Sequence, residues 1–200
     1  MATKPMELML EQADYHRLET QDGKVNEYVT VRPRIRGDVE QNREAGNAGF
    51  YPAGKPGKSS QTKDKQQSLS VDKFNKLMEK SGNELRIDEN MKESQQLVGK
   101  DTPDDKRPVM KAAMQGYKTE KTEDGKIKKA PSSNPKDIEV YRMSMKSVEK
   151  SDFPEFSKEE HHKGISETNK ARRLEQEKQK EEKEQEAPQK DEAEADLPFD

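Results

Sequence analysis

The chain has 200 residues, of which 40% are charged, and Leu, Ile, Val and Phe together supply 28 residues, or 14%. This apolar fraction lies below the roughly 20% under which a chain is read as disordered, and the mean hydropathy of −1.39 agrees. Because ordering a residue costs about 1.5 kcal/mol, we expect a mostly disordered, extended chain with short α-helices, at most one or two short strands and no single large globular core.

The composition also excludes several classes of site. A net charge of −3 argues against wholesale non-specific binding to nucleic acid, which needs a basic excess. The chain has no cysteine, which excludes disulfides, thiolate zinc sites and thiol catalysis. It has no run of 18 apolar residues, so no membrane span is expected, and residues 1–20 lack the apolar stretch of a secretion signal. We therefore expect an intracellular protein, located in the cytoplasm.

The first expected element is a short helix over residues 4–20. Pro5 suits a first helical position, and the apolar residues after it have the i, i+3, i+4, i+7 spacing of one helix face. These residues are Met6, Met9, Leu10 and Ala13. Asp22-Gly23 then marks a turn, and the alternation of apolar and polar side chains over residues 24–31 predicts a strand.

A basic segment continues this strand. Arginine stands at every second position, at Arg32, Arg34 and Arg36. Pro33 confines the segment to a sheet edge or to an isolated extended stretch. The arginines could contact phosphates, with Tyr28 or Tyr51 available for base stacking. Two alternatives stay open: a sheet edge protected by charge and contact with an acidic protein surface.

Residues 37–69 are expected to form a flexible linker, because glycine, proline, lysine, glutamine and serine are frequent in them. Residues 70–116 are the best candidate for local folding, as a marginal cluster of short helices. The clearest of these helices begins after Ser70, a good capping residue, and ends at Gly82. Its apolar residues share one face: Val71, Phe74, Leu77 and Met78.

Two further helices are expected in this cluster. One runs over residues 89–98. The other begins at Thr102, where a cap, a first-turn proline and two acids follow one another, or it restarts at Pro108 and runs to Met114. Methionines in such a cluster fill a core or form an adaptable docking face.

Residues 117–156 are expected to be extended and to contain a weak hairpin. Asp124-Gly125 is a hairpin turn signal, but nearly all of the flanking residues are polar, so the hairpin would not be stable alone. We favour a short strand within residues 137–149, although the periodicity there leaves a helix open.

Residues 157–187 are expected to form a charged, solvated helix, and residues 188–200 an acidic tail. The helix begins with the reciprocal capping pattern of Ser157 and Glu160. Beyond residue 166 it carries one large apolar side chain, Leu174. Pairs of opposite charge along it stabilise a helix by about 0.2–0.5 kcal/mol each.

No group of residues predicts catalysis, a metal site or a cofactor site. Catalysis needs groups that are held rigidly in a water-poor pocket. The chain has only three histidines that could serve as such groups, His16, His161 and His162. The adjacent pair lacks the spacing of two histidines four apart around a glutamate, and we expect a solvated charged turn there. The protein is therefore expected not to be an enzyme and to bind no cofactor.

Short apolar anchors separated by polar stretches suit a chain that orders on binding to protein partners. Phe153 and Phe156, set around a proline, are typical of anchors that fill a partner's pocket. The candidate partner-binding residues are Met6, Met9, Leu10, Phe50, Tyr51, Phe74, Leu77, Met78, Met110, Met114, Tyr141, Phe153, Phe156, Leu197 and Phe199.

The C-terminal residues resemble the acidic tip of bacterial single-stranded-DNA-binding proteins. Acidic residues precede the apolar ending Leu197-Pro198-Phe199. The resemblance implies that Phe199 fills a pocket of a recruited replication or repair enzyme, while Asp196 contacts a basic residue. This chain departs from the family's pattern because Asp200 follows Phe199 and moves the terminal carboxylate off the aromatic residue. The barrel domain of that family needs five well-formed strands, which we do not expect here.

Two functions follow from these features. The first is a non-enzymatic interaction or structural protein, ordered by protein partners within a large assembly. The second is an accessory protein of nucleic-acid metabolism, in which the arginine segment touches phosphates and the tail recruits enzymes. The expected regions are residues 1–36, 37–69, 70–116, 117–156, 157–187 and 188–200.

Overall fold

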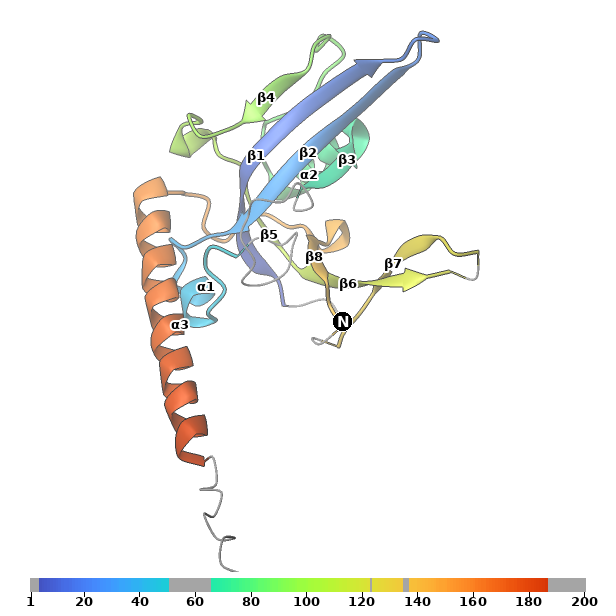
Figure 1. Cartoon of the computed structure of the whole chain (residues 1–200). Helices are drawn as coiled ribbons and strands as arrows, with labels where there is room; N and C mark the ends of the chain where they lie inside the picture. Colours follow the sequence, from blue (N-terminus) through green and yellow to red (C-terminus); the bar gives the residue numbers. More distant parts are fainter. Residues whose placement is uncertain (1–3, 51–65, 123, 135–136, 187–200) are drawn as a thin grey trace, which may run out of the picture.

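The computed structural model describes residues 4–50, 66–122, 124–134 and 137–186, and in these ranges the chain is folded. Eight strands form two antiparallel sheets, and three α-helices accompany them (Figure 1). The expectation of a mostly disordered chain without a globular core is therefore wrong. None of the helices in the described ranges is long and apolar enough to cross a membrane.

The larger sheet is built around the longest strand, β1. Its strands are β1 (Met6–Glu19), β2 (Val25–Ile35), β3 (Gln67–Ser70), β4 (Gln95–Val98) and β5 (Val109–Ala112). β2 pairs along one edge of β1, and β5 and β4 pair along the other. In the order β3-β2-β1-β4 the fourth strand returns beside the first, which is a Greek key. This sheet alone has five strands, whereas the sequence led us to expect at most one or two short strands in the whole chain.

β1 lies where the sequence predicts a helix, over residues 4–20, and that prediction is wrong. The pairing of β1 with β2 shifts register between Leu10 and Gln12, as at a β-bulge. The buried residues on either side of the shift are Leu8 and Leu10, then Ala13 and Tyr15. Because the bulge interrupts the alternation of the strand, its apolar residues imitate the spacing of a helix face.

The turn and the strand that follow β1 are confirmed. Gly23 in the turn has a φ of 76°, a conformation that glycine adopts without strain. β3 pairs with Tyr28–Val31 of β2, so Pro33 lies beyond the end of β3. This position agrees with the sheet edge expected for a proline in a strand.

α2 (Val71–Ser81) forms as the sequence predicts. Ser70 Oγ accepts a hydrogen bond from the Lys73 N–H at 3.4 Å, and Gly82 ends the helix in the left-handed conformation with a φ of 71°. The helix packs against β2, β3 and β5. Its side chains that fill the core are Phe74, Leu77 and Met78.

The structure describes all residues from 89 to 114, and the prediction of two further α-helices in this stretch is wrong. β4 occupies the end of the first segment, and the second forms the short 3-10 helix η2 (Asp104–Lys106) followed by β5. Both β4 and β5 pair with β1. Tertiary pairing therefore overrides weak local preferences for helix.

The smaller sheet has the strand order β7-β6-β8. Its strands are β6 (Met114–Lys121), β7 (Ile127–Pro131) and β8 (Val140–Met143), and the 3-10 helix η3 (Met145–Ser147) follows. The predicted hairpin at Asp124-Gly125 and the short strand within residues 137–149 are confirmed. The hairpin projects from the body of the molecule (Figure 1), and β8 supports its first strand.

The last helix, α3 (Lys158–Glu186), confirms the predicted charged helix, but its first turns are docked rather than solvated. They lie against α1 (Glu40–Glu44) and the loop before it (Figure 1). A Cβ on Gly164 would lie 1.8 Å from the Gly37 carbonyl oxygen, and a Cβ on Gly37 would lie 2.4 Å from the His161 carbonyl oxygen. Two glycines therefore allow the backbones to meet.

The distribution of apolar residues explains why so polar a chain folds. Residues 51–65 contain none of the 28 Leu, Ile, Val and Phe residues, and the last 44 residues contain four of them. The average over the whole chain therefore understates the apolar content of the sheets. Of the 24 buried apolar residues in the described ranges, ten are Met, Ala or Tyr. Residues 37–69, expected as a linker, contribute α1 and β3 to the fold.

Candidate nucleic-acid interface

β1 and β2 turn one side toward the core and the opposite side outward. Along β2, Val29 and Val31 are fully buried, whereas Tyr28, Thr30 and Arg32 are partly exposed. Directly paired residues of antiparallel strands point to the same side, so the β1 partners of these residues also face outward. We call this surface the outer face, which comprises Gln12, Asp14, His16, Tyr28, Thr30, Arg32 and Arg34.

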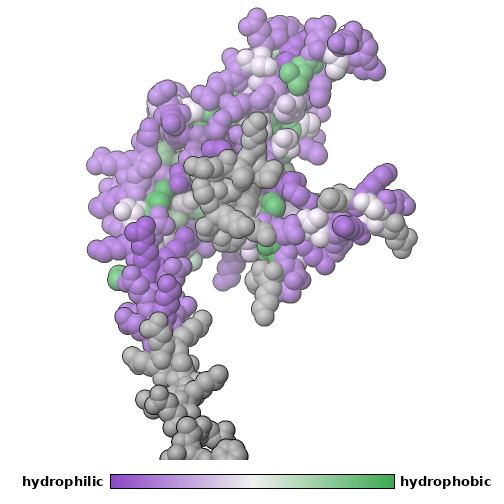
Figure 2. All heavy atoms as spheres, in the orientation of Figure 1, coloured by the Kyte–Doolittle hydropathy of each residue, from purple (hydrophilic) through white to green (hydrophobic). Residues whose placement is uncertain are grey.

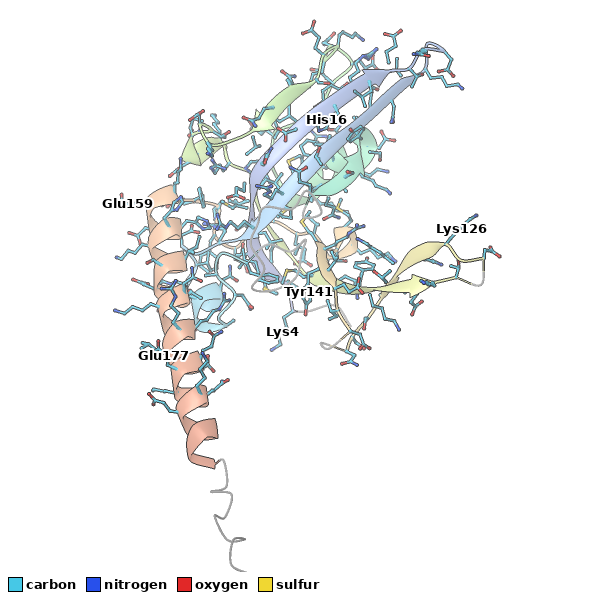
Figure 3. All side chains as sticks on the ribbon, in the orientation of Figure 1. Lys4, His16, Lys126, Tyr141, Glu159 and Glu177 are labelled. Atoms are coloured by element: carbon cyan, nitrogen blue, oxygen red, sulfur yellow. The ribbon has the colours of Figure 1, made fainter. Side chains whose placement is uncertain are left out.

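An aromatic pair lies on the outer face. The rings of His16 and Tyr28 stack with centroids 4.7 Å apart and an angle of 20° between their planes. His16 Nε2 is also hydrogen-bonded to the Thr30 hydroxyl, and Figure 3 shows His16 on the hairpin of β1 and β2. Stacked rings on a polar surface give a base or another ring a place to stack. The sequence indicates Tyr28 for this role but not His16, which only the strand register brings opposite.

Two of the three predicted arginines lie on the outer face. Arg32 is on the same side of β2 as Tyr28. Arg34 forms an ion pair with Glu11, with Nη1 and Oε1 2.8 Å apart, and its Nε donates to the Gly49 carbonyl at 3.3 Å. The ion pair fixes the Arg34 guanidinium and compensates part of its charge.

Arg36 has a structural role instead of the predicted phosphate contact. Its side chain is 1% exposed, and Nη2 lies 2.6 Å from Asp38 Oδ2. Its guanidinium also donates to the carbonyl oxygens of Phe153 and Glu155. The guanidinium therefore joins the end of β2 to the segment before α3 and is not available on the outer face.

Most of the predicted partner-binding side chains are core residues of the chain itself, which leaves them little surface to offer a partner. The buried ones are Met9, Leu10, Phe74, Leu77, Met78, Met110, Met114 and Phe156. Phe153 is 39% exposed, whereas Tyr51, Leu197 and Phe199 lie outside the described residues. The surface visible in Figure 2 is accordingly mostly hydrophilic, with few hydrophobic patches.

Four of the predicted anchors meet around one cleft of about 530 Å³, which we call the apolar cleft. They are Met6, Phe50, Met114 and Tyr141. The rings of Phe50 and Tyr141 meet edge to face, with centroids 5.8 Å apart. Lys4 and Arg172 also line the cleft, and Figure 3 shows Lys4 and Tyr141 in the same region. These four side chains therefore line one concave surface, to which the buried Met114 contributes little exposed area.

His161 is buried, where the sequence suggests a solvated turn. It is 1% exposed, and its Nδ1 accepts a hydrogen bond from the Gly37 N–H at 2.8 Å. Burial and the nearby charge of Arg34 lower the pKa of its imidazole to about 4, and the Asp38 carboxylate acts in the opposite direction. The ring is therefore neutral near pH 7. Local sequence gives no signal for this burial, because the partner lies 124 residues earlier.

Comparison with known proteins gives no function for this chain. No protein-family model matches it, no curated protein matches it, and no solved structure matches its fold. Among the described residues, no three His, Cys, Asp or Glu side chains are placed to hold a metal ion.

Proposed function

We propose that the chain is a non-enzymatic accessory protein that binds single-stranded nucleic acid on the outer face. The stacked pair of His16 and Tyr28 carries this proposal, because single strands bind by stacking their bases on aromatic side chains. Arg32 lies four residues beyond Tyr28 on the same side of β2. It would meet the phosphates that flank a stacked base.

The architecture supports the proposal. Partly open, five-stranded Greek-key barrels bind oligonucleotides on the face of their second and third strands. Four strands of the larger sheet are in Greek-key order, a fifth strand, β5, pairs with β1, and α2 lies between β3 and β4 in the chain. The outer face shares β2 with the binding face of such barrels, and it includes the stretch of β2 that pairs with β3.

The distribution of charge is also compatible with strand binding. The last 14 residues contain one lysine and five acidic residues, a net charge of −4. The preceding 186 residues therefore carry a net charge of +1, against −3 for the whole chain. Because this excess is small, stacking rather than long-range attraction should supply most of the affinity.

Titration of a fluorescent oligothymidylate with the full chain tests the proposal. Stacking contributes about 1–3 kcal/mol per base, so Tyr28→Ala should weaken binding by about tenfold or more. Arg32→Ala should weaken binding less, and it should reduce the slope of log K against log salt by about one unit, as expected for one lost phosphate contact.

The smaller sheet provides matched control variants. Tyr117 and Arg142 make a cation–π contact of 5.9 Å there, away from the outer face. Tyr117→Ala and Arg142→Ala remove the same residue types and should leave the affinity for the oligonucleotide unchanged. If a folded Tyr28→Ala variant binds as tightly as the wild type, the outer face is not the binding surface.

A second candidate function is the docking of a protein partner at the apolar cleft, favoured by the convergence of the four predicted anchors there. We infer a partner segment with an apolar side chain flanked by acidic residues, which would meet Lys4 and Arg172. A partner that co-purifies with the chain should be lost with Tyr141→Ala and retained with Phe153→Ala. If the partner is lost from both variants, or is retained by both, the apolar cleft is not the docking site of that partner.

The acidic tail extends the proposed function from binding to recruitment. Leu197 and Phe199 lie outside the described residues, so this part depends on the resemblance of the tail to the tip of single-stranded-DNA-binding proteins. Removing residues 197–200 should abolish co-purification with nucleic-acid enzymes and leave oligonucleotide affinity intact. If the truncated chain still co-purifies with those enzymes, the tail does not recruit them.

A further inference from the structure

Asp14 is the one carboxylate among the residues of the outer face. It lies directly opposite Thr30 of β2 and two positions before His16 on β1, which corresponds to about 7 Å along the strand. It is therefore beside the stacked pair of His16 and Tyr28, on the same side of the sheet. A stacked purine spans a comparable distance, so the edge of a base held over the aromatic pair comes within reach of the Asp14 carboxylate.

Two glutamine amides hold this carboxylate in place. Gln12 Nε2 donates to Asp14 Oδ2 at 2.5 Å, and Nε2 of Gln96, on β4, donates to Asp14 Oδ1 at 3.3 Å. Gln96 pairs directly with Asp14, so it points to the same side of the sheet. A Cβ at Gly99 would lie 2.1 Å from Gln96 Oε1, so the glycine leaves room for this amide. The carboxylate is thus oriented from both sides before a ligand binds.

The oriented carboxylate keeps acceptor positions for a ligand. Each oxygen of an ionised carboxylate has two acceptor positions, and the two amides use one on each oxygen. Among the described residues, no lysine or arginine forms an ion pair with Asp14. Its negative charge would repel a phosphate. The group that suits it best is therefore a pair of neighbouring N–H donors.

Guanine is the base whose pairing edge presents this pattern. Its N1–H and N2–H groups are adjacent donors, and the O6 acceptor beside them can take the second N–H of a glutamine amide. Adenine and cytosine each present one exocyclic amine next to an acceptor, and thymine presents a single N–H between two acceptors. Of the four bases, guanine alone engages both carboxylate oxygens without placing an acceptor against one of them.

We propose that the outer face recognises guanine in a single strand, with Asp14 as the residue that determines this specificity. The inference rests on the proposed strand binding and refines it. The aromatic pair stacks the base, Arg32 meets the phosphate, and Asp14 accepts hydrogen bonds from the edge of the base. Proteins that bind single strands sequence-specifically commonly combine stacking with hydrogen bonds to this edge.

Competition titrations with the full chain test the inference. A fluorescent oligothymidylate is displaced by unlabelled oligomers of equal length, in which thymidine alternates with deoxyguanosine, deoxyinosine or deoxycytidine, and by unlabelled oligothymidylate. The guanine oligomer should bind about tenfold more tightly than oligothymidylate, because a bidentate contact discriminates between bases by about this factor. The inosine oligomer, which lacks only the N2 amine, should lose most of this gain.

Asp14→Asn replaces one acceptor oxygen by a donor at almost unchanged volume. It should weaken binding of the guanine oligomer about tenfold. It should strengthen binding of oligothymidylate, because a negative charge near the phosphates is removed. Damage to the sheet would weaken both, so the opposite signs separate recognition from misfolding.

Asp137→Asn is the matched control. Asp137 lies exposed between β7 and β8, in the smaller sheet, and it also accepts a hydrogen bond from an amide, Asn134 Nδ2 at 3.0 Å. The substitution removes the same charge from the chain as Asp14→Asn does. It should change the affinity for neither oligomer.

Equal affinities of the wild type for all the oligomers would overturn the inference and leave the proposed strand binding intact. A guanine preference that survives in Asp14→Asn, or tighter binding of the cytosine oligomer than of the guanine oligomer, would also overturn it. If no oligomer binds, the proposed function fails as well, so the two failures are distinguishable. In a ribonucleotide series of the same sequences, a preference confined to one series would assign the site to that kind of strand.

Discussion

The two long helices, α2 and α3, are attached to the fold in different ways. α2 buries an apolar face between capped ends. α3 is mostly polar and leaves Leu174 52% exposed; it docks through buried His161, Gly164 and Thr168 and through the partly buried Ile165. A polar helix can therefore be a fixed part of a small fold when small and polar residues meet backbone groups. The substitutions and conditions that weaken the docking of α3 should therefore differ from those that weaken the packing of α2.

The largest effect is expected from the apolar face of α2. Phe74 is fully buried in the core, so Phe74→Ala should lower the free energy of unfolding of the whole domain by about 3–5 kcal/mol. Urea unfolding followed by circular dichroism measures the loss. A decrease below about 1 kcal/mol would mean that α2 is not integral to the core.

Acid should weaken the attachment of α3. The His161 pKa is about 4 in the fold, against 6.5 when unfolded. Because the unfolded chain takes up this proton first, the stability contributed by the neutral ring is complete above pH 6.5 and decreases as the pH falls toward 4. A shift of this size corresponds to about 3 kcal/mol.

Comparison with His161→Asn isolates this effect from the titration of carboxylates. Limited proteolysis within α3 at pH 7 and at pH 4.5 should show acid-induced cleavage in the wild type and a smaller change in the variant, which cannot titrate at this position. The nearby charges of Arg34, Arg36, Asp38 and His162 are unchanged by the substitution. An equal response of both proteins would remove His161 as the cause.

A smaller effect is expected where the backbones of α3 and the Gly37 loop meet. Gly→Ala inside a helix normally stabilises by about 1 kcal/mol, but a Cβ at Gly164 would lie 1.8 Å from the Gly37 carbonyl oxygen. Gly164→Ala should therefore destabilise the docking by about 1–3 kcal/mol and speed proteolysis of α3. Ser166→Ala, at an exposed position of the same helix, should not.

The smallest effect is expected at Leu174, the exposed apolar residue of α3. Leu174→Gln should change the free energy of unfolding by less than about 0.5 kcal/mol, because the side chain loses little contact. Equilibrium urea unfolding measures the change. A larger loss would show that the apolar surface of α3 is covered in solution.

Elements with local signals were predictable from the sequence. Ser70 and Gly82 mark the ends of α2, and Asp22-Gly23 and Asp124-Gly125 mark two hairpins. β1 was not predictable because the register shift beside Leu10 disguises its alternation. β4 and β5 were not predictable because each has four residues and is held by pairing with β1.

The candidate site was only partly predictable for a related reason. The period-two arginines point to a strand with a basic side, and Arg32 and Arg34 do lie on the outer face. The same pattern cannot show that Arg36 is turned inward to Asp38. The roles of His16 and His161 depend on partners that are distant in sequence, Tyr28 and Gly37.

The length of α3 sets a spacing between the sheets and whatever follows the helix. Arg172 still lines the apolar cleft, and from there to Glu186 the helix rises roughly 21 Å, clear of the body in Figure 1. A protein held at the end of this rigid spacer would occupy a different volume from a strand bound on the outer face. Both could therefore be engaged at the same time without steric competition.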